Sequence, residues 1–240
     1  MPRRLVIIPT FNESSNIEEL LRRLFKYIPD ISVLVIDDNS PDGTSELCHR
    51  LQSQYPELHI YRRDMKLGLG SAYRLGFAWG LERGYSELIE MDADHSHRVR
   101  DLATMLDEHS RDPRIGLVIG SRWMPGGAII NWPRRRELLS RTANRYVQLM
   151  LGTKVKDSTS GLRIYSAETL RAIDLHTIRS EGYSFQIEMT RAVIEAGKTI
   201  KEVQITFRER ENGVSKMSSA IVREALLMVT IWGLKRFIKR

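Results

Sequence analysis

The stretch Leu88-Ile89-Glu90-Met91-Asp92-Ala93-Asp94 joins a buried strand to the polar residues that follow it. Its first four residues form a short, mostly apolar run of the kind that fills a strand inside a sheet. Two carboxylates then follow one residue apart, separated by a small residue that allows a ligand to approach closely. Oxygen ligands suit Mg²⁺ or Mn²⁺, which leave positions open for phosphate oxygens. The stretch therefore predicts a metal site at a strand end, with a turn or helix cap as the alternative.

Apolar strands alternate with amphipathic helices around this stretch. The first half of the chain has strands expected at 5–8, 33–36, 59–61, 88–91 and 115–119, each connected to the next by a helical pattern. Such alternation predicts an α/β fold with a mainly parallel central sheet and helices on both faces. The second half is less regular, with helices expected at 136–151 and 185–195 and strands at 162–165 and 203–207.

Three of the expected strands end in polar residues. These ends are Thr10-Phe11-Asn12-Glu13, Asp37-Asp38-Asn39-Ser40 and Asp92-Ala93-Asp94. In parallel α/β sheets, ligands bind beyond the carboxyl ends of the strands. The acidic rim therefore predicts a nucleotide site, with Asp38 as a binding residue. Turn chemistry is the alternative for the segment after the second strand, and we expect Pro41-Asp42-Gly43 to serve as a turn.

Length and charge narrow the class of protein. The chain has 240 residues and a net charge of +7, which suits phosphate-bearing ligands, an anionic membrane surface or nucleic acid. The single cysteine, Cys48, cannot form an internal disulfide, which fits a reducing compartment. The N-terminus lacks the pattern of a signal peptide, and no apolar stretch reaches the roughly 18 residues that span a bilayer. We expect a cytoplasmic protein, peripheral at the cytoplasmic face of a membrane.

The C-terminal segment reads as a separate helix. Residues 1–218 are expected to form the catalytic domain, and residues 219–240 a basic amphipathic helix containing Trp232. Such a helix can lie in a membrane interface. Packing against the domain is the alternative.

Basic residues of the second half are candidates for binding anions. They include Arg122, Arg136 near Ser140, and the pair Arg210 and Lys216 that brackets a polar loop. Arginine clamps phosphate with two hydrogen bonds, and lysine acts as a point charge. A solvated charged face is the alternative for Arg134 and Arg135. A non-catalytic basic nucleotide- or RNA-binding module would explain the charge but not the acidic rim, so no nucleic-acid partner is expected.

The ordered motifs of this chain resemble those of the dolichol- or polyprenol-phosphate mannosyltransferases, which are family 2 glycosyltransferases of GT-A fold. The motifs are Pro9-Thr10-Phe11-Asn12-Glu13, Asp37 to Thr44, Gly68-Leu69-Gly70, Met91 to Asp94, Gly120-Ser121-Arg122 and Asp157 to Gly161. The resemblance implies inverting transfer of mannose from GDP-mannose to a polyprenyl (dolichyl) monophosphate in a membrane, with Mg²⁺ or Mn²⁺. UDP-glucose as the donor is the alternative within the same chemistry.

The resemblance also implies roles for individual residues. Asp94, Arg122, Arg136 and Ser140 would be catalytic, and the last three would hold the acceptor phosphate. Asp92 and Asp94 would bind the metal, with Ser96 standing where some members carry a glutamine ligand. The donor nucleotide sugar would contact Pro9, Phe11, Glu13, Ile36, Asp38, Asp92, Ala93, Asp94, Arg210 and Lys216. Peripheral membrane contact or a membrane-protein partner would bring the lipid to the site.

Overall fold

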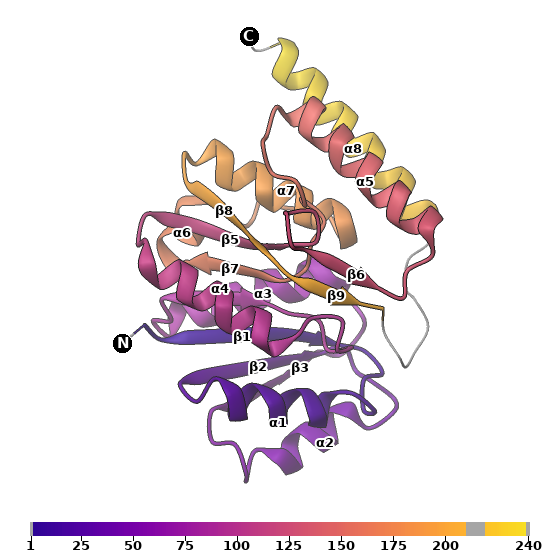
Figure 1. The fold of residues 1–240 in the computed structure, drawn as a ribbon. Helices are drawn as coiled ribbons and strands as arrows, with labels where there is room; N and C mark the ends of the chain where they lie inside the picture. The colour runs from indigo at the N-terminus through magenta and orange to yellow at the C-terminus, as the bar shows by residue number, and fades with distance from the viewer. Residues whose placement is uncertain (1, 210–218, 239–240) are drawn as a thin grey trace.

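A seven-stranded sheet forms the centre of the molecule (Figure 1). The computed structural model describes residues 2–209 and 219–238, with side chains placed up to 209 and from 223 to 236. The strand order is β3 (Leu58–Arg62), β2 (Ile31–Asp37), β1 (Arg4–Thr10), β4 (Glu87–Glu90), β7 (Arg163–Ser166), β5 (Ile115–Ser121) and β8 (Thr199–Gln204). All neighbouring pairs are parallel except those that β7 makes with β4 and β5. The expected mainly parallel sheet is confirmed.

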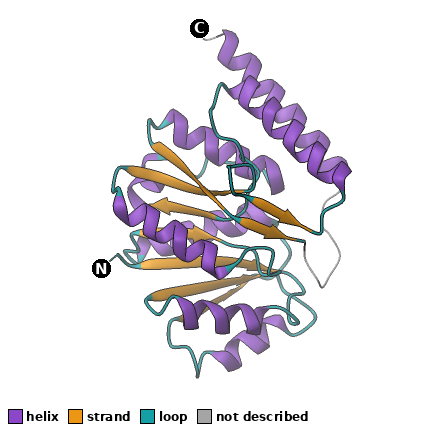
Figure 2. Ribbon diagram, in the orientation of Figure 1, coloured by secondary structure: helices purple, strands orange, loops and turns teal. Residues whose placement is uncertain are grey.

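Helices cover both faces of the sheet, as the alternating pattern predicted (Figure 2). One face packs α1 (Ile17–Tyr27), α2 (Thr44–Leu51) and α4 (Val99–Arg111). The other face packs α3 (Leu69–Glu82), α6 (Ala167–Ala172) and α7 (Gly182–Glu195). Successive side chains of a strand point to opposite faces, so Val6 and Ile8 join the first core while Leu5 and Ile7 join the second. The middle of β1, from Leu5 to Ile8, is therefore apolar on both faces.

Two long helices lie side by side at one end of the molecule (Figure 1). They are α5 (Arg134–Leu151) and α8 (Ser219–Ile238). A small apolar core joins them to α7 through Val147, Ile187, Val229 and Trp232. Leucines on both helices are nevertheless exposed, among them Leu138, Leu149, Leu227 and Leu234. Among the side chains of α8 that the structure describes, apolar ones therefore occur both on the side that packs against α5 and α7 and on part of the solvent-exposed side.

Residues 199–208 differ from expectation. The alternation of Val203, Ile205 and Phe207 predicted one strand, but β8 ends at Gln204 and β9 (Thr206–Arg208) belongs to a different sheet. There it pairs in parallel with β6 (Ala128–Ile130), which the sequence did not predict. The single-strand prediction was wrong because side-chain alternation continues across Ile205 while the hydrogen-bonding partner changes. Among the described residues, no helix is long and apolar enough to cross a bilayer.

Candidate functional site

Loops from both halves of the chain meet at the carboxyl edge of the sheet. The parallel strands β1, β2, β4 and β5 all end there. Because β7 is antiparallel to its neighbours, the loop that enters it, residues 157–161, lies at the same edge. A Cβ atom placed on Gly161 would lie 3.3 Å from Asp92 Oδ2, so this loop touches the metal motif. The fold brings together segments that are far apart in sequence.

The two aspartates after β2 have different surroundings. Asp37 is fully buried and accepts hydrogen bonds from Thr10 Oγ1 at 2.9 Å and from the Ser40 amide at 2.9 Å. It therefore ties the ends of β1 and β2 together. Asp38 pairs with Arg63, which is itself buried, and accepts a bond from the Leu67 amide at 3.2 Å. Both Asp38 oxygens are engaged by the protein, and Arg63 is a partner that sequence reasoning missed.

The other expected nucleoside residues surround the same corner. Pro9 and Ile36 are register partners on β1 and β2, and the Ile36 side chain is completely buried in the core, which leaves its backbone for contact with a ligand. The ring of Phe11 lies 4.1 Å from the Lys66 ammonium. Glu13 is buried and accepts a bond from Asn16 Nδ2 at 2.8 Å. The corner thus offers an aromatic face beside fixed carboxylates.

The metal motif follows β4 directly. The Asp92 side chain is 37% exposed, whereas Asp94 and Ala93 are buried. The Ser96 amide donates to Asp94 Oδ1 at 3.1 Å, which fixes the orientation of that carboxylate. Two hard oxygen donors beside an open edge fit Mg²⁺ or Mn²⁺, because these ions complete their coordination shell with water and substrate phosphate. Among the described residues, no group of three or more acidic, histidine or cysteine side chains could hold a metal ion.

Two further residues pack against this motif. Ser96 is buried, and its carbonyl accepts a bond from the Arg208 amide at 3.0 Å. His97 is also buried, with Nε2 3.4 Å from Asp92 Oδ2 and its ring edge-on to Phe207. The segment after the two aspartates is therefore anchored to β9.

A buried ion pair dominates the other side of the site. Arg122 donates from Nε and Nη2 to the two oxygens of Asp157, at 2.8 and 2.7 Å, and its Nη2 also reaches Thr159 Oγ1 at 2.8 Å. Burial would raise the pKa of Asp157, but the Arg122 guanidinium outweighs it and the pKa is lowered. Burial would likewise lower the pKa of Arg122, and Asp157 raises it. Both groups therefore remain ionised at neutral pH.

Aromatic rings frame the two candidate arginines. The Arg122 guanidinium lies 5.4 Å from the ring centres of both Trp132 and Phe207. Arg136 stacks 4.1 Å from Trp132 and pairs with Glu209. Sequence reasoning missed the roles of Trp132, Phe207 and Glu209, because their contacts with the two arginines join separate segments of the chain.

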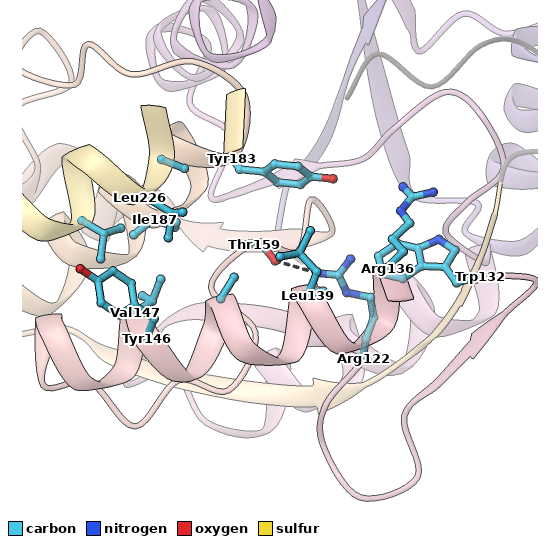
Figure 3. A pocket seen from close by; sticks show the side chains of 14 residues that line it. Arg122, Trp132, Arg136, Leu139, Tyr146, Val147, Thr159, Tyr183, Ile187 and Leu226 are labelled. Atoms are coloured by element: carbon cyan, nitrogen blue, oxygen red, sulfur yellow. Dashed lines mark hydrogen bonds between the residues drawn. The ribbon is translucent and has the colours of Figure 1, made fainter. Parts of the chain in front are cut away.

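A pocket connects these arginines to an apolar interior (Figure 3). Arg122, Arg136, Ser140 and Thr159 line its polar end. Trp132 also lines the pocket, and the remaining lining residues come from α5, α7 and α8, namely Leu139, Ala143, Tyr146, Val147, Tyr183, Ile187, Ala225, Leu226 and Val229. The structure thus brings together the three residues expected to bind the acceptor phosphate. It also adds an apolar channel that suits a lipid chain.

Two expected donor contacts, Arg210 and Lys216, lie outside the described residues. The remaining candidates form two groups along one edge. Pro9, Phe11, Glu13, Ile36 and Asp38 lie on the β1 and β2 side, and Arg122, Arg136 and Ser140 lie on the β5 and α5 side. Asp92, Ala93, Asp94 and Ser96 follow β4, which is between them in the sheet. This arrangement can hold a nucleotide and a second anion on either side of a metal.

The chain is similar to known proteins over most of its length. Residues 5–174 match the model for glycosyl transferase family 2. The polyprenol monophosphomannose synthase of Mycolicibacterium smegmatis is 48% identical over 97% of this chain and 88% of its own length. The undecaprenyl-phosphate mannosyltransferase of Micrococcus luteus is 49% identical over 97% of this chain and 94% of its own length.

Solved structures share the fold at low sequence identity. Glucosyl-3-phosphoglycerate synthase from Mycobacterium tuberculosis, in complex with Mn²⁺, UDP-glucose and phosphoglyceric acid, superposes with a TM-score of 0.69 at 18% identity, over 96% of this chain and 80% of that one. A mannosyltransferase from Pyrobaculum calidifontis, in complex with GDP-Man and Mn²⁺, gives 0.60 at 19% identity, over 100% and 65%.

Proposed function

Because the chain is a polyprenyl-phosphate mannosyltransferase of glycosyl transferase family 2 and has the GT-A fold, we propose that it transfers mannose from GDP-mannose to a polyprenyl monophosphate with inversion. The family expected from the motifs is confirmed. A purely binding module is thereby set aside. The identity of the donor, the stereochemistry and the place of the reaction are proposals.

The pocket beside α5 carries the acceptor assignment. Its polar end holds the guanidinium groups of Arg122 and Arg136 and the hydroxyls of Ser140 and Thr159, and most of the remaining lining is apolar. A polyprenyl monophosphate has the same division, with an anionic head and a hydrocarbon chain. Arg122 is already neutralised by Asp157, and Arg136 by Glu209. We infer that the acceptor phosphate takes the place of Glu209 on Arg136 and accepts additional bonds from Ser140 and from Arg122 Nη1.

The corner formed by β1 and β2 is assigned to the donor. Phe11 supplies a stacking face for the base, and Asp38 is held by Arg63 for contact with the nucleoside. The two curated relatives are named for mannosyl transfer, and the Pyrobaculum structure contains GDP-Man, which favours GDP-mannose over UDP-glucose. Pro9, Glu13 and the Ile36 backbone complete this half of the proposal. Arg210 and Lys216 are proposed to contact the diphosphate.

The chemistry requires little proton transfer. The acceptor phosphate is ionised near neutral pH, so its oxygen can attack the anomeric carbon without a strong general base. Arg122, Arg136 and Ser140 orient this oxygen, which is chiefly a positioning effect. Asp92 and Asp94 would hold Mg²⁺ or Mn²⁺, which supplies charge stabilisation to the departing diphosphate. Attack from the side opposite the leaving group inverts the α-linked sugar to a β-linked product.

We propose that α5 and α8 bring the site to a membrane. Their exposed leucines lie beside the pocket through which the lipid chain enters, and basic residues such as Arg145 and Lys235 occur on the same two helices. Apolar side chains flanked by basic ones bind the interface of an anionic bilayer. In this proposal, residues 1–218 form the catalytic domain and residues 219–240 form the helix that lies in the membrane interface. The cytoplasmic face is the proposed location, since GDP-mannose is a soluble donor.

A turnover assay tests the proposal. The purified chain is incubated with Mn²⁺, a short polyprenyl phosphate and either GDP-mannose or UDP-glucose, and nucleoside diphosphate release is measured. Release with GDP-mannose alone, together with a β-linked product by NMR, is the expected result. Release of nucleoside diphosphate only with UDP-glucose would make UDP-glucose the donor and leave the proposed acceptor unchanged. Absence of release with either donor would overturn the proposal.

A further inference from the structure

Arg163 has the largest side chain among the fully buried residues of the described chain. It begins β7, and only Leu162 separates it from the loop of residues 157–161. Its guanidinium donates from Nε to the Ser160 carbonyl at 2.8 Å and from Nη2 to the Ser158 carbonyl at 2.7 Å. Two backbone carbonyls of one loop are therefore held by one planar group.

The third nitrogen of the same guanidinium points to α7. Nη1 donates to the Gln186 carbonyl at 2.9 Å and to Thr190 Oγ1 at 3.0 Å. It also lies 3.3 Å from the Tyr165 hydroxyl. Arg163 thus bridges the loop to a helix packed in the second core. Because α7 is anchored by Phe185 and Met189, this attachment is rigid.

Stability alone does not explain a charged residue at this position. Within the described residues, Arg163 forms no hydrogen-bonded ion pair with a carboxylate; buried Glu90, its register partner on β4, interacts with it only through the electrostatic field. Removing a guanidinium from water is expensive, and well-packed apolar side chains often stabilise a core more than buried charges do. An apolar residue could not hold two carbonyl groups in one plane, whereas the planar guanidinium of Arg163 can.

The loop held in this way contacts both halves of the site. Asp157 and Thr159 accept hydrogen bonds from Arg122 Nη2 at 2.7 and 2.8 Å. Gly161 lies against Asp92. The carbonyls of Ser158 and Ser160, which Arg163 holds, alternate with the residues that make these contacts. Displacement of the two carbonyls would therefore displace the partners of Arg122.

We propose that Arg163 is a positioning residue for the acceptor phosphate. It holds the 157–161 loop so that Asp157 and Thr159 keep the Arg122 guanidinium aimed into the pocket. It contacts neither substrate. This inference rests on the proposed acceptor and assigns a role to a residue that lies behind the pocket wall.

The test is Arg163→Lys, which keeps the positive charge but loses the fork. Binding of farnesyl monophosphate, a short prenyl phosphate, is followed by tryptophan fluorescence, since Trp123 and Trp132 lie beside Arg122. Binding of GDP with Mn²⁺ is measured by calorimetry. We expect the Kd for farnesyl monophosphate to rise about tenfold or more, as for other residues that orient a ligand-binding group, and the Kd for GDP to change less than about twofold. Hydrogen exchange of the amides of residues 157–161 should accelerate.

Thr190→Val is the matched control. It removes an acceptor from the same guanidinium on the α7 side and leaves both loop carbonyls bonded. It should lower the melting temperature without changing the Kd for farnesyl monophosphate. Equal effects of both variants on this Kd would mean that Arg163 contributes only to stability, which would overturn the inference.

A second variant addresses misfolding. Arg163→Met combined with Glu90→Gln removes both buried ionisable groups at once and should fold, because no buried charge remains at this position. It should still show fast exchange in the loop and weak binding of farnesyl monophosphate. Normal binding in this variant would refute the positioning role. A parent protein that binds GDP with Mn²⁺ but no farnesyl monophosphate would overturn the acceptor assignment and this inference with it, whereas normal binding by Arg163→Lys overturns this inference alone.

Discussion

Arg122 and Asp157 form an ion pair with two parallel hydrogen bonds, at 2.8 and 2.7 Å, and both side chains are closed to solvent. The pair lies at the wall of the pocket assigned to the acceptor. The two charges of the pair cancel, so Arg122 contributes oriented hydrogen-bond donors to an anionic ligand more than it contributes net positive charge. The remaining attraction for an anionic head group comes from Arg136, whose partner Glu209 is half-buried and can be displaced.

Asp157→Asn should destabilise the protein. Loss of the carboxylate leaves a buried guanidinium unpaired, which costs about 3–5 kcal/mol of unfolding free energy. The pKa of Asp157 is lowered in the folded state, so its contribution is present above the ordinary value of 3.8 and is lost as the pH falls through the lowered value. Urea denaturation at neutral pH and at about pH 3 measures both effects. Asp112→Asn, in an exposed pair with Arg114, is the control and should change stability little.

Glu90→Gln should stabilise the protein above neutral pH. Burial raises the pKa of Glu90 from 4.5 to about 7, so the native state loses stability as the pH rises from about 4.5 to 7 and stays at that lower level above it. Glutamine removes this loss, with an upper limit of about 3 kcal/mol. Denaturation curves at pH 5 and pH 8 should therefore diverge between parent and variant only at the higher pH.

Glu87, at the other end of the same strand, is a control of opposite sign. Burial would raise the pKa of Glu87, but hydrogen bonds from His109 and Arg4 lower it. Glu87→Gln should therefore destabilise the protein at pH 8. Stabilisation by both glutamine variants would indicate that burial, and not the local partners, controls the two carboxyls.

Asp94→Ala should abolish turnover while the fold is retained. Residues that merely orient a metal ligand change affinity or activity by about 10–100-fold, and loss of a ligand should exceed this. The same loss should follow treatment of the parent with EDTA and be reversed by added Mn²⁺. Calorimetry with Mn²⁺ and GDP, together with circular dichroism, separates lost binding from lost structure. Asp107→Ala, at an exposed position on α4, should behave as the parent.

Leu227→Glu should weaken binding to anionic vesicles. Leu227 is 61% exposed on α8 and Leu138 is 68% exposed on α5, so charges at these positions oppose insertion of the two helices into the interface. Co-sedimentation with phosphatidylglycerol vesicles measures the effect. The double variant Leu227→Glu with Leu138→Glu should bind more weakly than either single variant. Tyr27→Glu, an equally exposed position on α1, is the control. Equal losses of vesicle binding in Leu227→Glu, Leu138→Glu and Tyr27→Glu would argue against a specific membrane face.

The sequence predicted those parts of the fold that repeat locally. The strands and helices up to β5 follow from apolar runs and helical spacing, because each βα unit is built from neighbouring residues. The sequence did not predict β6, which has three residues and no measurable period, or α6, which is also short. It also did not reveal that β7 is antiparallel, since strand direction depends on partners far away in the chain.

The candidate site divides in the same way. Asp38, Asp92 and Asp94 could be proposed from the sequence because they lie within four residues of the end of an apolar strand. Arg63 pairs with Asp38 across 25 residues, and Glu209 with Arg136 across 73, and neither pair leaves a sequence pattern. The family resemblance implied roles for Arg122, Arg136 and Ser140 without indicating their partners. The structure supplies these partners.

The position of β7 has a consequence for how the chain assembles. The first four strands of the sheet, β3, β2, β1 and β4, neighbour one another in the sheet and are consecutive in the chain. In contrast, both neighbours of β5, namely β7 and β8, are made after it. A nascent chain can complete the nucleotide corner early, while β5 must wait for later residues before its edges are covered. Long-range strand pairing is slow, so this unpaired stretch is where a chaperone would find exposed backbone during synthesis.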